Sequence, residues 1–353
     1  MWPGPLRKHG RVFSFKGAKI SLVPFEKPHL SYAAQLALLK QRGLVVRDDQ
    51  QALWYLETAG YYRLSGYFYP FRCLPEPLVV NGKAQRQPRL SEFIAQSSFD
   101  AVASLYRFDN ELRLLALSAI EKLEIAIRAK IAHYLAEKDP SAHLNAELMH
   151  VKFRAAILDD VGNATPSNYE VWLQQHSKLI TRSKEDFVKH FRDKYEPPIP
   201  IWVSIEVWDF GLLSHFFNGL NDIDKAAIAS FFGLSRFVLL ASWLRSISHL
   251  RNICAHHSRL WNRALIDNPK PPGRNEIPLL EHLMGDPHDR THVYGTLAIM
   301  QFLLVKTGFG NAWADKLKSL VGTFPVLSPA ATLHAMGFPE HWDKLAIWNL
   351  PKE

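Results

Sequence analysis

One long helical pattern, over residues 100–136, constrains the fold of this chain more than any other feature. Its apolar side chains recur at steps of three or four residues, which places them on one face of a helix. A second stripe, at the same steps, carries both polar and apolar side chains. The apolar stripe is Leu105, Leu112, Leu115, Ala119, Leu123 and Ala126, and the second is Asn110, Arg113, Leu117, Glu121, Glu124, Arg128 and Ile131.

Shorter helical patterns lie on both sides of this segment. Ser31 is predicted to cap a helix that ends at Gly43. Asp48 or Asp49 is predicted to start a second helix, which runs to Gly60. Residues 201–220 predict a core helix in which Glu206, if buried, needs an arginine partner. Further helices are expected at 235–265 and in a block over 291–321. Prolines gather at the junctions 75–77, 197–200 and 269–272.

The fold class expected from these patterns is all-α. Residues 78–95, which include Asn81-Gly82, resemble an exposed loop that is able to hold a short β-hairpin. The length of 353 residues suits one large domain or two ordinary ones. We expect an N-terminal helical region at 1–99, a helical core at 100–265 with a basic insertion at about 140–200, and a C-terminal region at 266–353 packed on the core.

Composition favours a cytoplasmic protein with an acidic partner. A net charge of +8 and a pI near 9.3 favour nucleic acid, although many basic soluble proteins bind none. Cys73 and Cys254 form neither a disulfide framework nor a zinc motif. The first ten residues lack the apolar stretch of a signal peptide, and the apolar run 297–305 is about half of a membrane span.

The segment 249–263 carries the strongest chemical signal. If it is helical, Cys254 and Trp261 fall on the apolar side, and His257 turns toward the same side as a packed residue. The opposite side holds none of the Glu and Lys residues that usually fill a solvated face. It carries His249, Asn252, His256, Arg259 and Arg263 instead.

These residue types fit the cleavage of an RNA phosphodiester. Attack of a 2′-hydroxyl on the neighbouring phosphorus needs a base, an acid for the 5′-oxygen and a cation for the phosphorane. Histidine supplies the proton transfer, and arginine grips phosphate with two N–H groups. Arg251 and His256 diverge by roughly 140° on an ideal helix. A second copy of the helix across a two-fold axis would bring them together, so we expect a homodimer with a composite site.

Two other segments have competing interpretations. Residues 61–71 are dense in aromatic side chains and form either a packed corner or a base-stacking platform with Arg63 for phosphate. The insertion contains the most basic helical segment, which is either a solvated face or a contact for RNA.

The chain resembles the HEPN superfamily, whose signature is an arginine followed within a few residues by a histidine near the end of a helix. Here these are Arg251 and His256, with Asn252 as the polar residue after the arginine. More narrowly, it resembles the Abi-like family of bacterial abortive-infection proteins. The matching segments, in family order, are Gln35–Leu44, Gly60–Tyr67, Phe108–Arg113, Ile120–Glu124, Pro200–Trp202, Phe210–Ser214, Arg251–Arg263 and Met336–Pro339.

This resemblance implies a HEPN-type helical bundle, usually dimeric, that cleaves RNA without a metal or cofactor and halts growth of a phage-infected cell. It implies that an acidic residue on a preceding helix supports the Arg/His pair. Glu121 or Glu124 matches, with Glu121 slightly favoured, and Arg128 lies on the same stripe. The expected roles are catalysis for Arg251, Asn252, His256 and the glutamates, and RNA contact for Arg63, Arg128, His249, Arg259 and Arg263.

Two other functions are compatible with the same residues. The basic groove could hold a structured non-coding RNA without cutting it, since a bound RNA and a substrate RNA need the same cations. Alternatively, the chain could act through protein contacts, with the motif only stabilising a dimer.

Overall fold

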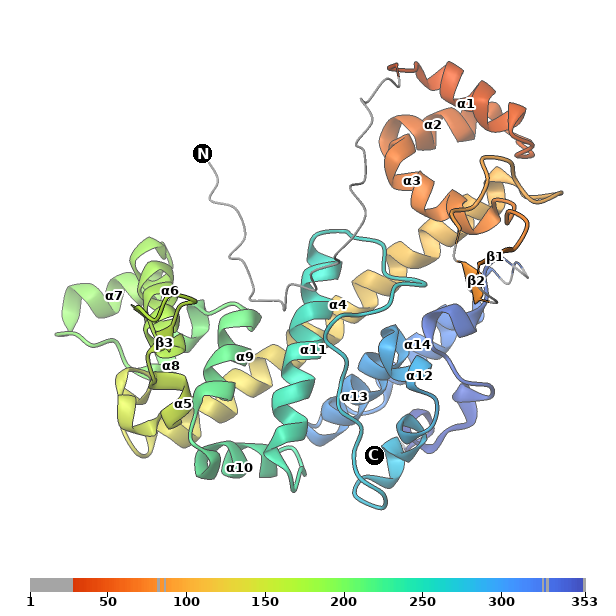
Figure 1. The fold of residues 1–353 in the computed structure, drawn as a ribbon. Coiled ribbons are helices and arrows are strands. Elements are labelled where there is room, and N and C mark those ends of the chain that lie inside the picture. Colours follow the sequence, from red (N-terminus) through yellow and green to blue (C-terminus); the bar gives the residue numbers. More distant parts are fainter. Residues whose placement is uncertain (1–27, 81–82, 86, 326, 328–329, 352–353) are drawn as a thin grey trace.

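The computed structural model describes residues 28–80, 83–85, 87–325, 327 and 330–351, and it is mostly helical (Figure 1). The predicted all-α fold is confirmed. So is a small hairpin near 78–95, where β1 (Leu78–Val80) pairs antiparallel with β2 (Lys83–Gln85). A second hairpin was not predicted: β3 (Ile157–Leu158) pairs with β4 (Ala164–Thr165). The Asp159 carboxylate holds its turn by accepting hydrogen bonds from the backbone of Val161 and Asn163.

The predicted long helix is confirmed as α4 (Phe99–Ala136), which crosses the whole molecule (Figure 1). Ser98 caps it by accepting a hydrogen bond from the Ala101 amide. Four residues of its apolar stripe, Leu105, Leu112, Ala119 and Leu123, are buried, whereas Leu115 and Ala126 are half-buried. The helix packs in a bundle in which α11 contacts α4, α9, α10 and α13. The partners are α9 (Phe210–Gly219), α10 (Asp222–Ser230), α11 (Phe237–Ala255), α13 (Val293–Lys306) and α14 (Ala312–Gly322).

Smaller groups of elements pack at the two ends of α4 (Figure 1). At its N-terminal end lie α1 (Tyr32–Gln41), α2 (Asp49–Thr58), α3 (Tyr61–Phe68) and η1 (Tyr69–Phe71). The predicted caps Ser31 and Asp48 accept hydrogen bonds from Ala34 and Gln51. Gly60, with a φ of +82°, allows the sharp turn from α2 into α3. Near the other end lie α5 (Val151–Arg154), α6 (Asn168–Arg182), α7 (Asp186–Lys194) and α8 (Ile201–Ser204).

The remaining elements are short. They are α12 (Pro287–Thr291) and the 3-10 turns η2 (Ala142–Leu144), η3 (Ala146–Leu148), η4 (Ile205–Val207), η5 (Pro278–Met284), η6 (Leu333–Met336), η7 (Trp342–Lys344) and η8 (Ala346–Trp348). One continuous set of buried side chains runs from Leu36 to Trp348, through all three predicted regions. No helix in the described ranges is long and apolar enough to cross a membrane. Residues 1–27, Asn81, Gly82 and Arg86 lie outside the described residues, so the expectation that the first ten residues form no signal peptide is not tested.

The prediction of one continuous core helix over 201–220 is wrong. The chain forms α8 and η4, leaves helical geometry at Trp208 and restarts as α9. The restart occurs because Asp209 caps α9, its carboxylate accepting a hydrogen bond from the Leu212 amide at 2.7 Å. Glu206 is exposed rather than buried, and it lies 3.7 Å from Arg128, the kind of partner expected for it.

Two buried histidines in the insertion make stability depend on pH. Burial lowers the pKa of His143 to about 3 and that of His176 to about 4, and the neutral His176 Nδ1 accepts a hydrogen bond from the Trp208 indole at 3.0 Å. Both folded values lie below the unfolded value near 6.5. The two histidines therefore contribute fully to the free energy of unfolding above pH 6.5. This contribution is lost as the pH falls toward 4, because over that range only the unfolded chain takes up the protons.

We expect acidification from pH 7 to pH 5 to cost about 2 kcal/mol of unfolding free energy per histidine. In His143→Phe the difference in unfolding free energy between pH 7 and pH 5 should be smaller than in wild type by up to about 2 kcal/mol, as measured by urea unfolding at both pH values. His190→Phe, at an exposed position, controls for the loss of a histidine as such. An equal drop in wild type and His143→Phe would show that His143 does not couple folding to pH.

Candidate functional site

The motif helix α11 ends at Ala255, ten residues before the predicted end at 265. The predicted extent of this helix is therefore wrong. His257 adopts a left-handed conformation with a φ of +55°. Two backbone hydrogen bonds close the turn: the His257 amide donates to the Cys254 carbonyl at 3.0 Å, and the Ser258 amide donates to the Ile253 carbonyl at 2.9 Å. This pattern ends a helix and usually carries glycine at the left-handed position.

The early end of α11 rearranges the predicted polar stripe. Arg259 and Arg263 lie beyond the helix, so they do not continue the face of His249 and Asn252. His257 is exposed, which contradicts its prediction as a packed residue, because the helical periodicity used to place it no longer applies. Trp261 and Cys254 are buried as predicted. Burial raises the pKa of the Cys254 thiol to about 12, so this thiol stays protonated.

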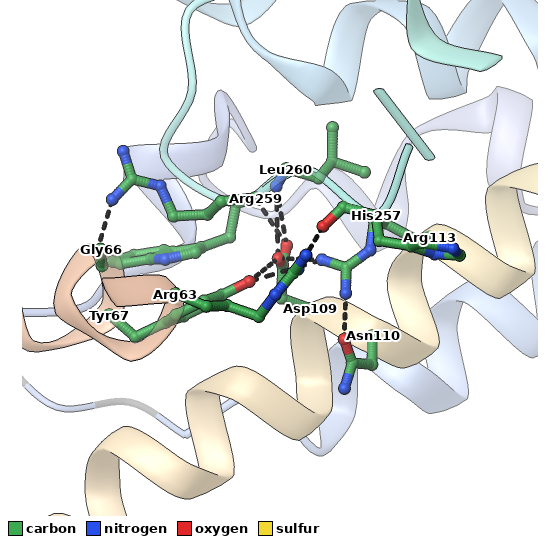
Figure 2. Close-up of polar contacts among 10 residues, drawn as sticks. Arg63, Gly66, Tyr67, Asp109, Asn110, Arg113, His257, Arg259 and Leu260 are labelled. Carbon is green, nitrogen blue, oxygen red and sulfur yellow. Dashed lines mark hydrogen bonds and ion pairs between the residues drawn. The ribbon is translucent and has the colours of Figure 1, made fainter. Parts of the chain in front are cut away.

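A buried carboxylate, Asp109 on α4, anchors the loop that follows α11 (Figure 2). It accepts hydrogen bonds from the backbone amides of Trp261 at 2.7 Å and Leu260 at 3.2 Å. It also accepts one from the Tyr67 hydroxyl of α3 at 2.5 Å and pairs with Arg113 one turn further along α4. Since two charges and two amides satisfy one another here, Asp109 fixes α3, α4 and the loop in one arrangement.

The loop that follows α11 and helix α3 together line an open pocket of about 620 Å³ beside the end of α11. Four predicted site residues line it: His256, Arg63, Arg259 and Arg263. Among the described residues that line this pocket, none is acidic. The full lining is Tyr62, Arg63, Ser65, Gly66, Tyr67, His256, His257, Ser258, Arg259 and Arg263, which we call the arginine pocket.

Backbone carbonyls hold two of these arginines in place (Figure 2). Arg63 donates to the His257 carbonyl at 2.5 Å, and Arg259 donates to the Gly66 carbonyl. These contacts tie the start of α3 to the end of α11. A guanidinium has five N–H donors, so each arginine keeps donors for a ligand. No ion pair joins Arg63 or Arg259 to a carboxylate of the described residues.

Arg251, on α11, is not among the described residues that line the arginine pocket. Its charge acts on Glu124, which also pairs with Arg128. Burial raises the pKa of Glu124, while Arg128 and Arg251 act in the opposite direction. Glu121 is exposed, so the geometry supports Glu124 as the acidic neighbour of Arg251 and gives the slight preference for Glu121 no support.

Arg128 is largely occupied by contacts within the chain. Its side chain is 14% exposed, pairs with Glu124 and donates to the Trp208 carbonyl. It therefore holds the break between η4 and α9, and these contacts give its expected role in binding RNA no support.

His249 and Asn252 line a second pocket, of about 540 Å³, on another side of α11. Arg245 and His215 line it too, and the His249 Nδ1 lies 3.9 Å from an Asp267 carboxylate oxygen. The predicted stripe is thus divided between two pockets, with His249 and Asn252 in one and His256, Arg259 and Arg263 in the other. In the described ranges, no group of three or more His, Cys, Asp or Glu side chains is arranged to hold a metal ion.

Sequence reasoning assigned no role to Asp109, Arg113 or Tyr67. The available signal was an aspartate and an arginine four residues apart in a helix that is otherwise predicted to be core. That spacing predicts an ion pair, but it does not predict that the same carboxylate binds a loop more than 150 residues away.

The chain matches the model of one protein family. Residues 54–262, more than half of the sequence, match the family model described as Abi-like protein. The chain therefore belongs to the Abi-like family of abortive-infection proteins. The matched segment includes α3, α4, α11 and the loop through Trp261. No curated protein and no solved structure matches the chain.

Proposed function

We propose that this protein is an endoribonuclease that acts in defence against phage, with its site at the end of α11. The observation that carries the proposal is the arginine pocket, where the exposed His256 and three arginines gather and the described lining residues include no carboxylate. Phosphate binding needs this cationic lining, and proton transfer needs a histidine within reach of it.

The proposed reaction consists of two proton transfers, one from the 2′-hydroxyl to a base and one from an acid to the 5′-oxygen, while one P–O bond forms and another breaks. A base takes the proton of the 2′-hydroxyl, the 2′-oxygen bonds to phosphorus, and the 5′-oxygen leaves with a proton from an acid. His256 acts as the base or the acid, while Arg259 and Arg263 hold the phosphates. The products are a 2′,3′-cyclic phosphate and a 5′-hydroxyl.

We further propose that the active form is a homodimer. Within one chain, Arg251 faces Glu124 on α4, whereas His256 faces the pocket beside α3. A second copy that presents its α11 end would add its Arg251 to the His256 of the first, with Asn252 orienting the substrate. Full cleavage activity in a protein that sediments as a monomer would contradict this composite site.

The proposal is tested by the ends of the RNA products. Purified protein in excess EDTA should cut RNA to leave a 2′,3′-cyclic phosphate or 3′-phosphate and a 5′-hydroxyl, as mapped by end-specific ligation and mass spectrometry. Products with 5′-phosphate ends, or a strict magnesium requirement in the chemical step, would contradict the mechanism. RNA that is bound tightly and stays intact would favour the alternative function, a protein that holds a non-coding RNA.

A further inference from the structure

The arginine pocket has an unusual rim residue, Tyr62, whose side chain is 93% exposed. The other aromatic residues of α3 are used for packing: Tyr67 and Phe68 are buried, and the hydroxyl of Tyr61 accepts a hydrogen bond from Arg42 at 3.1 Å. The packed-corner interpretation of this segment therefore describes most of its rings. Two rings of the segment are exposed, Tyr62 at 93% and Tyr69 at 40%, and of these two Tyr62 lines the arginine pocket.

The position of Tyr62 is fixed relative to His256. Tyr62 and Arg63 are neighbours in the first turn of α3, and Arg63 donates to the carbonyl of His257, the residue after His256. The Asp109–Tyr67 hydrogen bond holds the other end of α3 to α4. These contacts therefore hold the backbone that carries Tyr62 and Arg63 next to the backbone that carries His256.

An exposed aromatic ring beside phosphate-binding arginines has a specific use in nucleic-acid recognition. Unpaired bases stack on such rings whatever their sequence, while adjacent cations follow the backbone. The bases of an A-form duplex are already stacked on one another, and its deep major groove excludes side chains. A ring at this position therefore selects for single-stranded RNA.

We propose that Tyr62 determines substrate class by stacking on an unpaired base next to the phosphate held by Arg63, Arg259 and Arg263. This inference rests on the proposed function and narrows it: the substrate is single-stranded RNA or an unpaired loop. Selection acts on base pairing rather than on base identity.

The test measures RNA affinity in the uncut state, with His256→Ala in every protein. Fluorescence anisotropy compares a labelled, unstructured RNA strand with the same strand in a duplex. Tyr62→Ala should weaken single-strand binding on the order of tenfold and leave duplex binding unchanged, because only the unpaired base loses its stacking partner. Tyr62→Phe, which keeps the ring, should bind like the parent. Tyr32→Ala, at an exposed tyrosine on α1 outside the pocket, is the matched control.

Two results would overturn the inference while leaving the proposed function intact. One is parental single-strand affinity in Tyr62→Ala, and the other is an equal loss for strand and duplex. Failure of the parent protein to bind either RNA would instead contradict the proposed function itself, and the inference with it.

Discussion

Asp109→Asn should destabilise the protein by about 3–5 kcal/mol, because it leaves the buried Arg113 guanidinium without its counter-charge. The asparagine would also present an amide to donors that now meet a carboxylate, including the backbone amides of Leu260 and Trp261. Urea unfolding, followed by tryptophan fluorescence, measures the loss as a lower midpoint. The loop that carries Arg259 and Arg263 should loosen as well.

Asp49→Asn is the matched control for this change. Asp49 pairs with Lys40 at 2.7 Å on the surface, where the aspartate is 54% exposed. Solvent weakens such a pair, so its loss should cost at most about 1 kcal/mol. Equal unfolding midpoints for Asp109→Asn and wild type would show that the buried cluster does not stabilise the fold.

Local patterns were sufficient to predict the helices whose ends are marked by side chains. The long helix α4 follows from its apolar stripe, and α1 and α2 begin at Ser31 and Asp48, whose oxygens cap them as expected. In each case the interactions that form the helix join residues a few positions apart in the sequence, so a local sequence pattern is sufficient to predict them.

The end of α11 could not be predicted in the same way. A left-handed residue that ends a helix is usually glycine, but here it is His257, so the expected signal is missing. The sequence predicts four residues of the pocket: Arg63, His256, Arg259 and Arg263. However, the shared helix face that groups His256, Arg259 and Arg263 in the prediction does not exist in the structure. They converge because Asp109 draws the loop onto α4 and because α3 packs beside it. Such tertiary contacts leave no periodic pattern.

His256→Ala should reduce the rate of RNA cleavage about 10²- to 10⁴-fold, the usual contribution of a positioned acid or base. RNA affinity should persist, since the three arginines of the pocket remain. The fold should be unaffected, because the imidazole is exposed and makes no hydrogen bond to another described side chain or backbone group. His341→Asn is the matched control: it removes an exposed imidazole outside the arginine pocket, and asparagine tolerates the left-handed backbone at this position, where φ is +55°.

The central claim is that His256 at the end of α11 takes part in cutting RNA. Its most direct test is the single-turnover cleavage rate of one short single-stranded RNA by wild type, His256→Ala and His341→Asn at saturating protein. This claim predicts a loss of at least about a hundredfold in His256→Ala, with a rate within a few-fold of wild type in His341→Asn. Cleavage at the wild-type rate by His256→Ala would contradict it.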